Sequence, residues 1–469
     1  MILVPLAFGA ALARLRQDPV VPQVPIKTPP PRVQDTKLPP AIVPPTNVGE
    51  TVKFSLEEAV RISLRDQPGI AGAQGAVTTA QGRARQSEAL QNPQLILGTG
   101  YDGLRSFSGD PSGTPLQAPT GSTSPGVSPA FPYSTALAAR QLLFDFNQTR
   151  NVVRQNRALT DVALANLTRV QQNVVNGVEI AFYNVVDAQR LVDVAEQNLA
   201  NRQRQLDLAD ARFRHGVGVP ADVVTAQTSK SQAVLNVQNA RDNLLQSRYS
   251  LLLAMGVDPL TPVEIAPSDE SEVRETDPKA LVDLGLQRRP EVRAAFSAVS
   301  ATKYGLNAAK SLNLPSIYFT AAAGTVGNSI GDGRTTGSIG VGLQFPLFDG
   351  GTRRGAVQSA NGQVTTAVAN LKDATLQVRN DVTSAYVALQ SAEARVATVE
   401  SEVANAREGV RIAEGRYEAG LGLFQDITTA QGQLLTALQD RTSVRRLVNL
   451  ARVRLRYATG DISSNLARP

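Results

Sequence analysis

Residues 371–417 read LKDATLQVRNDVTSAYVALQSAEARVATVESEVANAREGVRIAEGRY. Apolar side chains recur along this stretch in steps of three and four residues, from Leu371 to Tyr417, with a mean step of about 3.5 residues. This is the repeat of a coiled coil, and it predicts one long helix rather than several short ones. Residues 167–213 carry the same pattern with one exception, because Arg202 stands where the pattern requires an apolar side chain.

The chain contains two copies of one unit. An offset of 204 residues links Asp222 to Asp426, and an offset of 222 residues links Pro68 to Pro290. The offset becomes smaller between these two positions, which means that the first copy carries a longer loop between them. We place this loop in the Ser-, Gly- and Pro-rich segment 106–132. The copies are far longer than the roughly 20–50 residues of a solenoid repeat. The pattern therefore indicates a duplicated domain.

The duplication divides the chain into two structural repeats, 51–257 and 278–460, joined by a connector at 258–277. Each repeat reads as a helix, two strands, a long helix and a shorter helix. The expected bounds are strands 94–103 and 133–143, long helix 147–213 and helix 221–255 in the first repeat, and strands 315–325 and 337–347, long helix 351–417 and helix 423–459 in the second.

Three further segments lie outside the repeats. Residues 1–13 hold an apolar run that ends in a small-x-small pattern, and we interpret them as a truncated signal peptide. The basic residues that should precede such a run are missing, so an apolar terminus without a targeting role is the alternative. Residues 14–50 are rich in proline and predict an extended linker, and residues 461–469 form a tail.

The composition argues against several classes of function. The chain has no Cys, which excludes disulfides and thiolate metal sites. The net charge of +6 comes without any long basic run, so nothing favours nucleic-acid binding. The single histidine, His215, has no companions for metal ligation or for a catalytic triad. We therefore predict that the protein is not an enzyme and that it binds neither a cofactor nor a metal.

The strands bear on the number of chains. Residues 338–347 alternate between apolar and small or polar side chains, as a half-buried strand does. Four strands per chain cannot close a barrel, because about eight are needed to surround a packed interior. Three chains would supply twelve strands, although four or more chains would also close the sheet. The predicted fold is mainly α, with duplicated coiled-coil helices in a trimeric α-helical tunnel and a twelve-stranded trimeric membrane β-barrel.

Three groups of residues carry a resemblance to a known family. The segments 211–218 and 416–422, and the segments 221–227 and 425–431 that follow them, resemble paired helix tips. Residues 343–351, LQFPLFDGG, resemble a strand-to-helix junction. Together they are similar to the TolC-like outer-membrane efflux proteins, over about Phe54 to Gly460.

The resemblance implies a passive exit duct for tripartite efflux or type I secretion. It would be a homotrimer that sits in outer-membrane lipid and extends into the periplasm. There it would meet a periplasmic adaptor protein, and through the adaptor an inner-membrane pump. The alternative is a periplasmic coiled-coil scaffold or tether, which would use the same helices without a barrel.

The resemblance also places the functional residues at the helix tips. Asp426 matches an acidic position that faces the tunnel, where three copies would form a cation-attracting ring. Asp222, its repeat equivalent, would either join this acidic gate or cap its helix. Tyr417 matches a tyrosine of the closure contacts. Thr429 stands where some relatives carry a second acid, and Gly422 where some carry an arginine. The turns expected to contact the adaptor are Gly216, Val217 and Gly218, and Gly420, Leu421 and Gly422.

Overall fold

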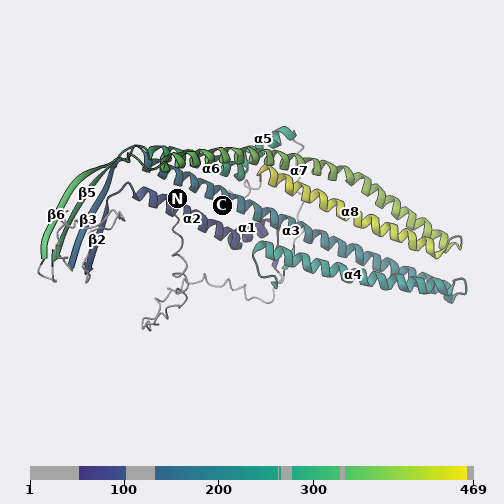
Figure 1. The fold of residues 1–469 in the computed structure, drawn as a ribbon. Helices are drawn as coiled ribbons and strands as arrows, with labels where there is room; N and C mark the ends of the chain where they lie inside the picture. Colours follow the sequence, from purple (N-terminus) through teal and green to yellow (C-terminus); the bar gives the residue numbers. More distant parts are fainter. Residues whose placement is uncertain (1–51, 102–132, 262, 266–276, 328–332, 462–469) are drawn as a thin grey trace, which may run out of the picture. The chain divides into compact units, whose positions relative to one another are not determined.

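Four long helices form two hairpins in the computed structural model. The first hairpin consists of α3 (Gln148–Arg214) and α4 (Pro220–Met255). The second consists of α7 (Thr352–Glu418) and α8 (Phe424–Thr459). α3 and α7 have 67 residues each, and α4 and α8 have 36 each, so the two copies agree in length. Both hairpins turn at the same end of the helical region (Figure 1).

The structure describes residues 52–101, 133–261, 263–265, 277–327 and 333–461, which all belong to the unit 51–469. The predicted signal peptide, the proline-rich linker, the loop 106–132 and all but the first residue of the tail lie outside these ranges. Our predictions for those segments stay predictions.

The coiled-coil pattern forms the core of the hairpins. Val378, Val382 and Val403 of α7 are each at most 2% exposed, and all three belong to the predicted apolar repeat. Near the tips, side chains of α3, α4, α7 and α8 join one buried cluster that includes Ile427. Burial of a Val or Ile side chain contributes roughly 1.5–3 kcal/mol. The long helices are therefore stabilised by continuous packing along their length and not by propensity alone.

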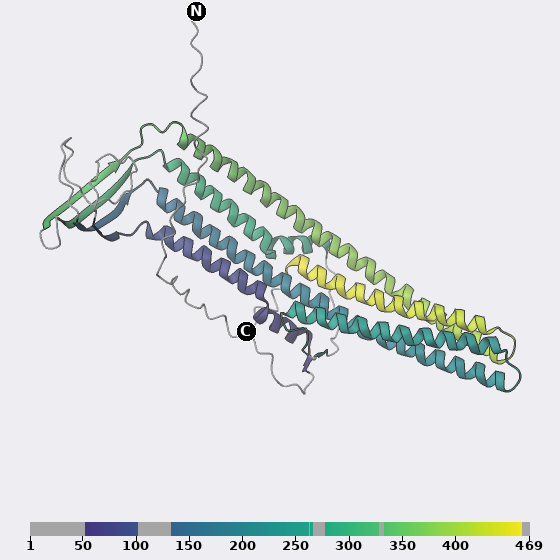
Figure 2. The same cartoon turned by 60° about the horizontal axis from the view of Figure 1, so that its bottom comes forward.

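Each repeat begins with two helices where the sequence suggested one. These are α1 (Leu56–Asp66) and α2 (Pro68–Ala89) in the first repeat, and α5 (Pro278–Arg288) and α6 (Pro290–Ser311) in the second. A proline at the first position of α2 and of α6 separates the helices, because it forces the preceding residue into an extended conformation. Figure 2 shows α2 and α6 beside the strand-proximal parts of α3 and α7.

Two three-residue strands form a small parallel sheet that was not predicted. β1 (Val52–Phe54) pairs with β4 (Val263–Ile265), which lies in the segment interpreted as a connector. Strands this short carry no usable alternation, so only the folded chain reveals them.

None of the described helices combines the length and the apolar character needed to cross a membrane.

The main sheet has four antiparallel strands in the order β2-β3-β5-β6. The central pairing of β3 with β5 joins the two repeats, and β2 and β6 are the edges. β6 begins and ends earlier than the predicted 337–347, so Phe345 and Leu347 follow the strand instead of belonging to it. The bounds are β2 Gln94–Tyr101, β3 Tyr133–Phe144, β5 Ser316–Gly327 and β6 Gly333–Gln344.

The sheet exposes apolar side chains along both edges of the single chain. Leu95 and Leu97 of β2 are 69% and 70% exposed, and Ile339 and Leu343 of β6 are 78% and 68% exposed. Open apolar edges are normally covered or paired in native proteins. The sheet is therefore incomplete in one chain.

Candidate functional site

The two hairpins turn through the same backbone geometry. Gly216 and Gly420 both have φ of +74°, in the left-handed region that glycine adopts without strain. In each turn the following N–H donates to the carbonyl of an arginine near the end of the long helix. These bonds are Val217 N–H to Arg212 O, 3.0 Å, and Leu421 N–H to Arg416 O, 2.8 Å.

A second glycine in each turn is required by close approach of the backbone. A Cβ atom at Gly218 would lie 2.7 Å from the backbone N of Phe213 and 2.9 Å from the carbonyl C of Arg212. At Gly422 the nearest atom would be Cβ of Arg416, at 3.0 Å. Gly218 therefore tolerates a side chain less well than Gly422.

Tyr417 and Arg212 join the two hairpins at their tips. The Tyr417 hydroxyl donates to Asp222 Oδ2 at 3.0 Å, from α7 to the first turn of α4. Arg212 of α3 donates to the carbonyl oxygens of Tyr417 and Glu418, at 2.7 and 3.0 Å. Its guanidinium also lies 4.6 Å from the centre of the Tyr417 ring. We call Arg212, Tyr417 and Asp222 the tip link.

The tip link is anchored in a packed environment. Tyr417 is 4% exposed, and its ring lies edge-on to Phe424, 5.6 Å between centroids. Burial, helped by the bond to Asp222 and by its charge, raises the pKa of Tyr417 to about 12, while Arg212 opposes the shift. The hydroxyl therefore stays protonated at neutral pH and donates to the Asp222 carboxylate.

Asp426 has a different environment from its repeat equivalent. It lies exposed in the first turn of α8, and its carboxylate accepts a hydrogen bond from the Leu423 N–H at 3.1 Å. This bond satisfies a free donor at the helix start. Asp222, in contrast, is half-buried and bonded to Tyr417. The structure thus brings Asp222 and Tyr417 together and leaves Asp426 outside the tip link.

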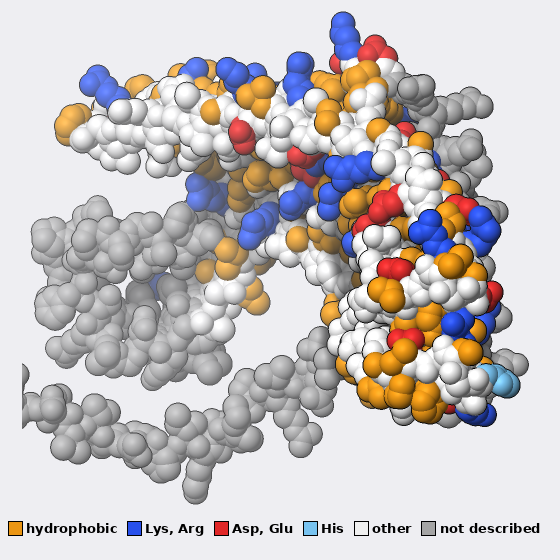
Figure 3. All heavy atoms as spheres, turned by 90° about the vertical axis from the view of Figure 1, so that its right-hand side faces the viewer, with side chains coloured by type: hydrophobic (Ala, Val, Ile, Leu, Met, Phe, Trp, Pro, Cys, Tyr) orange, Lys and Arg blue, Asp and Glu red, His pale blue; other side chains and the backbone are white. Residues whose placement is uncertain are grey.

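The tips expose a set of apolar side chains. Figure 3 faces this end and shows hydrophobic side chains gathered on it. Exposed apolar patches on folded proteins mark contact surfaces. We call this set the tip patch: Val217 (67% exposed), Val219 (58%), Leu421 (82%) and Leu423 (70%).

Two ion pairs join α3 to α8 farther from the tips. Arg456 binds Glu179 at 3.0 Å, and Arg446 lies 3.4 Å from Asp187. Burial raises the pKa of Asp187 to about 6, and the charges of Arg446 and Arg190 only partly oppose it. None of the described residues forms a hydrogen bond with the buried Oδ1 of Asp187. The ionised carboxylate is therefore poorly stabilised here.

This environment predicts a pH dependence of stability. The folded chain holds a proton on Asp187 more tightly than the unfolded chain, whose aspartates titrate near 3.9, so stability increases as pH falls from about 6 toward 4. The contribution is at most about 3 kcal/mol. The Asp187→Asn variant should lose this pH-dependent contribution to stability. Melting temperatures of the wild type and variant, measured from pH 4 to 8, would contradict the assignment if their difference did not change with pH.

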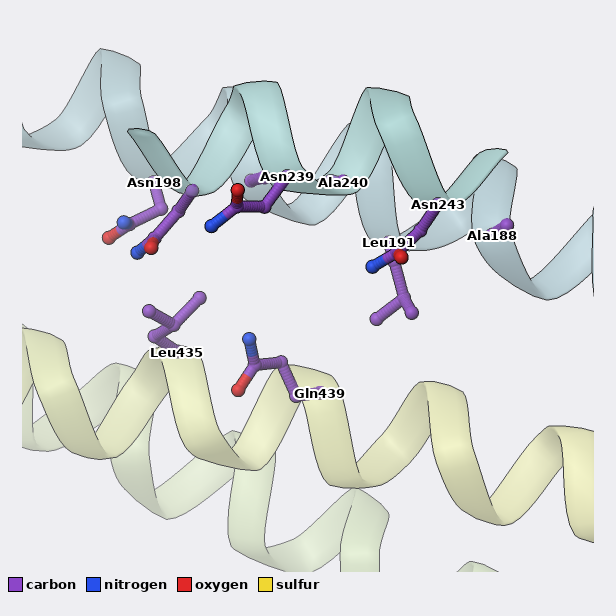
Figure 4. Close-up of a pocket in the computed structure, with 10 residues that line it drawn as sticks. Ala188, Leu191, Asn198, Asn239, Ala240, Asn243, Leu435 and Gln439 are labelled. Atoms are coloured by element: carbon purple, nitrogen blue, oxygen red, sulfur yellow. The ribbon is translucent and has the colours of Figure 1, made fainter. Parts of the chain in front are cut away.

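A hollow lies between the two hairpins, closer to the tips than these ion pairs. It has a volume of about 230 Å³ and lies between α3, α4 and α8. Figure 4 shows Asn198, Asn239 and Asn243 pointing from α3 and α4 into the space opposite Leu435 and Gln439 of α8. Side-chain amides therefore dominate its polar lining.

Two joined helical hairpins that carry an open antiparallel sheet define a class of protein, the channels of the outer membrane. Residues 60–257 and 281–461 match the family described as Outer membrane efflux protein, and the chain belongs to this family. The predicted family and fold class are confirmed.

Known proteins of similar sequence or fold agree with this family assignment. The chain is 27% identical over 348 residues to the outer membrane efflux protein BepC of Brucella suis, covering 72% of this chain and 75% of BepC. It is 26% identical over 339 residues to the alkaline protease secretion protein AprF of Pseudomonas aeruginosa, covering 70% and 69%. The crystal structure of VceC from Vibrio cholerae has the same fold, with a TM-score of 0.73 and 20% identity over 86% of this chain and 96% of VceC.

The chain is accordingly an outer-membrane channel of the efflux and secretion class, located in the outer membrane and extending into the periplasm. Members of this family are transport channels. The predicted function as an outer-membrane export channel and the predicted location are therefore confirmed. The roles of individual residues at the tips stay predictions.

Proposed function

We propose that three copies of this chain assemble into a homotrimer. The observation that carries the proposal is the pair of open edges, β2 and β6, with their exposed apolar side chains. Pairing β6 of one chain with β2 of the next three times over would close twelve strands and leave no free edge. The mass of the detergent-solubilised protein tests this: light scattering should give three chains per particle, and a monomer would contradict it.

We propose that the trimer is a passive exit duct that receives cargo from an inner-membrane pump through a periplasmic adaptor. The tip patch supports this, because an exposed apolar surface on both turns is available to a partner. The same turns, residues 216–218 and 420–422, were expected to contact the adaptor. Relatives named for efflux and for protease secretion support a duct that serves either kind of export.

We propose that the tip link holds the closed state. It joins α7 to α3 and α4 where the helices end, so outward movement of the second hairpin must break the bond between Tyr417 and Asp222.

Asp426, exposed on the first turn of α8, would contribute the acidic ring near the constriction. Three carboxylates around a threefold axis would attract cations.

Tyr417→Phe is expected to raise the open probability of the channel. The change keeps the ring packed on Phe424 and removes only the hydroxyl bond to Asp222. A hydrogen bond to a charged group contributes about 1.5–3 kcal/mol, so the open population should rise about tenfold or more. Single-channel recordings check this. Tyr457→Phe is the matched control, because its hydroxyl bonds Asn173 instead. Equal open probability in wild type and Tyr417→Phe would contradict the role of the link.

Asp426→Ala is expected to weaken block by multivalent cations. The change removes all three charges of the proposed ring, whereas Glu418→Ala removes an exposed charge at the end of α7 as a control. Current at increasing concentrations of a trivalent cation gives the half-blocking concentration, which should rise in Asp426→Ala alone. An unchanged value would exclude Asp426 from the ring.

A further inference from the structure

The main sheet carries its charge on one face. Its four strands contain two arginines, Arg140 of β3 and Arg334 of β6, and no aspartate or glutamate. Side chains alternate between the faces of a strand, and residues paired across antiparallel strands share a face. Arg140 pairs through Thr320 with Gly340, which is six residues from Arg334 along β6. Both arginines therefore lie on the same face.

Two neighbouring rows of paired residues show how the two faces differ. One row has only polar or small side chains in its four strands: Gln94, Arg140, Thr320 and Gly340. The next row, on the opposite face, has only apolar side chains: Leu95, Ala139, Ala321 and Ile339. In membrane barrels the apolar face contacts lipid and the polar face lines the interior. Arg140 therefore belongs to the face that would line the interior of a barrel.

Tyr318 of β5 holds Arg140 in place on this face. The Arg140 guanidinium carbon lies 4.1 Å from the centre of the Tyr318 ring, which is within cation–π range. Tyr318 pairs with Leu142, two residues after Arg140, so its side chain is on the same face. The tyrosine ring has no net charge, and an arginine stays charged at physiological pH. The contact therefore positions the guanidinium without neutralising it.

The charge lies near the end of the sheet that leads into the helices. β3 ends at Phe144, four residues after Arg140, and α3 begins at Gln148. A threefold axis would place three copies of Arg140 at one height. Twelve strands about 4.8 Å apart and tilted by about 40° give a barrel roughly 25 Å across. The Debye length of about 10 Å in 0.1 M salt is close to the radius of such a barrel, so three charges on its wall would act across the whole pore.

We propose that three copies of Arg140 form a ring that selects small anions over cations inside the barrel. We call it the Arg140 ring. The proposal rests on the proposed trimer, because a single chain supplies one arginine and no closed interior. The Arg140 ring is opposite in sign to the proposed Asp426 ring, which would lie at the other end of the long helices. The two ends of the duct would therefore attract ions of opposite charge.

The test measures the ion selectivity of the full-length protein in a planar bilayer. The reversal potential in a gradient of potassium chloride gives the ratio of chloride to potassium permeability. In about 0.1 M salt, Arg140→Gln should lower this ratio about twofold or more, and Arg140→Lys, which keeps the charge, should not. The difference should disappear in about 1 M salt, where the Debye length is about 3 Å. Each comparison is repeated with Asp426→Ala in every protein, so that the charge at the tips does not mask that of the barrel.

An introduced cysteine tests the charge at this position without any other change of sequence. The chain has no Cys, so a single thiol can be labelled without background. In Arg140→Cys, a water-soluble thiosulfonate that attaches a quaternary ammonium group should raise the permeability ratio, and one that attaches a sulfonate should lower it. Ala139→Cys is the matched control, because the neighbouring residue lies on the apolar face. Neither reagent should change its ratio.

The outcomes separate the Arg140 ring from the trimer. Wild-type channels whose permeability ratio is unchanged by Arg140→Gln, and by both reagents on Arg140→Cys, would overturn the Arg140 ring and leave the trimer standing. An equal response of Arg140→Cys and Ala139→Cys would also overturn it, since the two residues would then not lie on different faces. A wild-type protein without conductance would contradict the trimer itself. Should Arg140→Gln fail to assemble, the two reagents on Arg140→Cys carry the same test.

Discussion

Replacing Arg289 with methionine is expected to destabilise each chain by about 3 kcal/mol. Arg289 lies between α5 and α6, and its side chain is 6% exposed. It pairs with Glu291 at 3.0 Å and with Asp381 of α7 at 3.4 Å, and it lies 4.8 Å from the centre of the Tyr457 ring of α8. Methionine fills similar volume but leaves two carboxylates without their cation. We take the lower end of the range for buried pairs, because these carboxylates are partly exposed.

The melting temperature followed by the helical circular dichroism signal checks this prediction. Arg411→Met is the matched control, since Arg411 pairs with Glu408 on an exposed helix face where ion pairs contribute about 0–1 kcal/mol. The control should melt within a degree or two of the wild type, and Arg289→Met clearly below it. Equal melting temperatures for both variants would mean that the Arg289 cluster does not hold α5, α6, α7 and α8 together.

Gly218→Ala is expected to open the first hairpin turn, at a cost of about 1–3 kcal/mol. The new methyl group would meet backbone atoms of Arg212 and Phe213, which cannot move without disturbing the end of α3. The hydrogen bonds of the Val217 and Gly218 N–H groups to Arg212 O should then break more often. Amide exchange of the segment 212–222 should accelerate about fivefold or more, because each 1.4 kcal/mol is a factor of ten.

The control for Gly218→Ala is a glycine with free space around it. A Cβ at Gly415, inside α7 and near the second tip, would meet nothing within 4 Å. Gly415→Ala should therefore leave tip exchange unchanged or slow it, since alanine favours a helix interior over glycine by roughly 0.5–1 kcal/mol. Slow exchange in both variants would contradict the close approach at Gly218.

The sequence predicted the long helices well because their signal is local and long. The coiled-coil repeat covers residues 167–213 of α3, with Arg202 as its one exception, and residues 371–417 of α7, and the glycines mark the turns after these helices. The break between α1 and α2 was missed, although Pro68 was recognised as part of the duplication. The pairing of β1 with β4 joins residues more than 200 positions apart, and neither strand is long enough to show a pattern.

The site was predictable only in part. Tyr417 was identified through the resemblance, but its bond to Asp222 joins residues 195 positions apart and depends on how the hairpins pack. Arg212 recurs as Arg416 in the second copy, which was visible in the sequence. Among the described residues, Arg212 hydrogen-bonds to the other hairpin and Arg416 does not, and periodicity cannot reveal that difference. Duplicated residues can thus acquire different contacts because the two hairpins occupy different surroundings.

Single-channel recording in a planar bilayer tests the central claim, that this chain forms a pore across the outer membrane, most directly. The purified wild-type protein should insert and produce discrete conductance steps of uniform size, as a closed barrel of fixed strand number would. Protein that is extracted without detergent, runs as a monomer and produces no conductance would contradict the account, and would favour a periplasmic scaffold built from the same two hairpins.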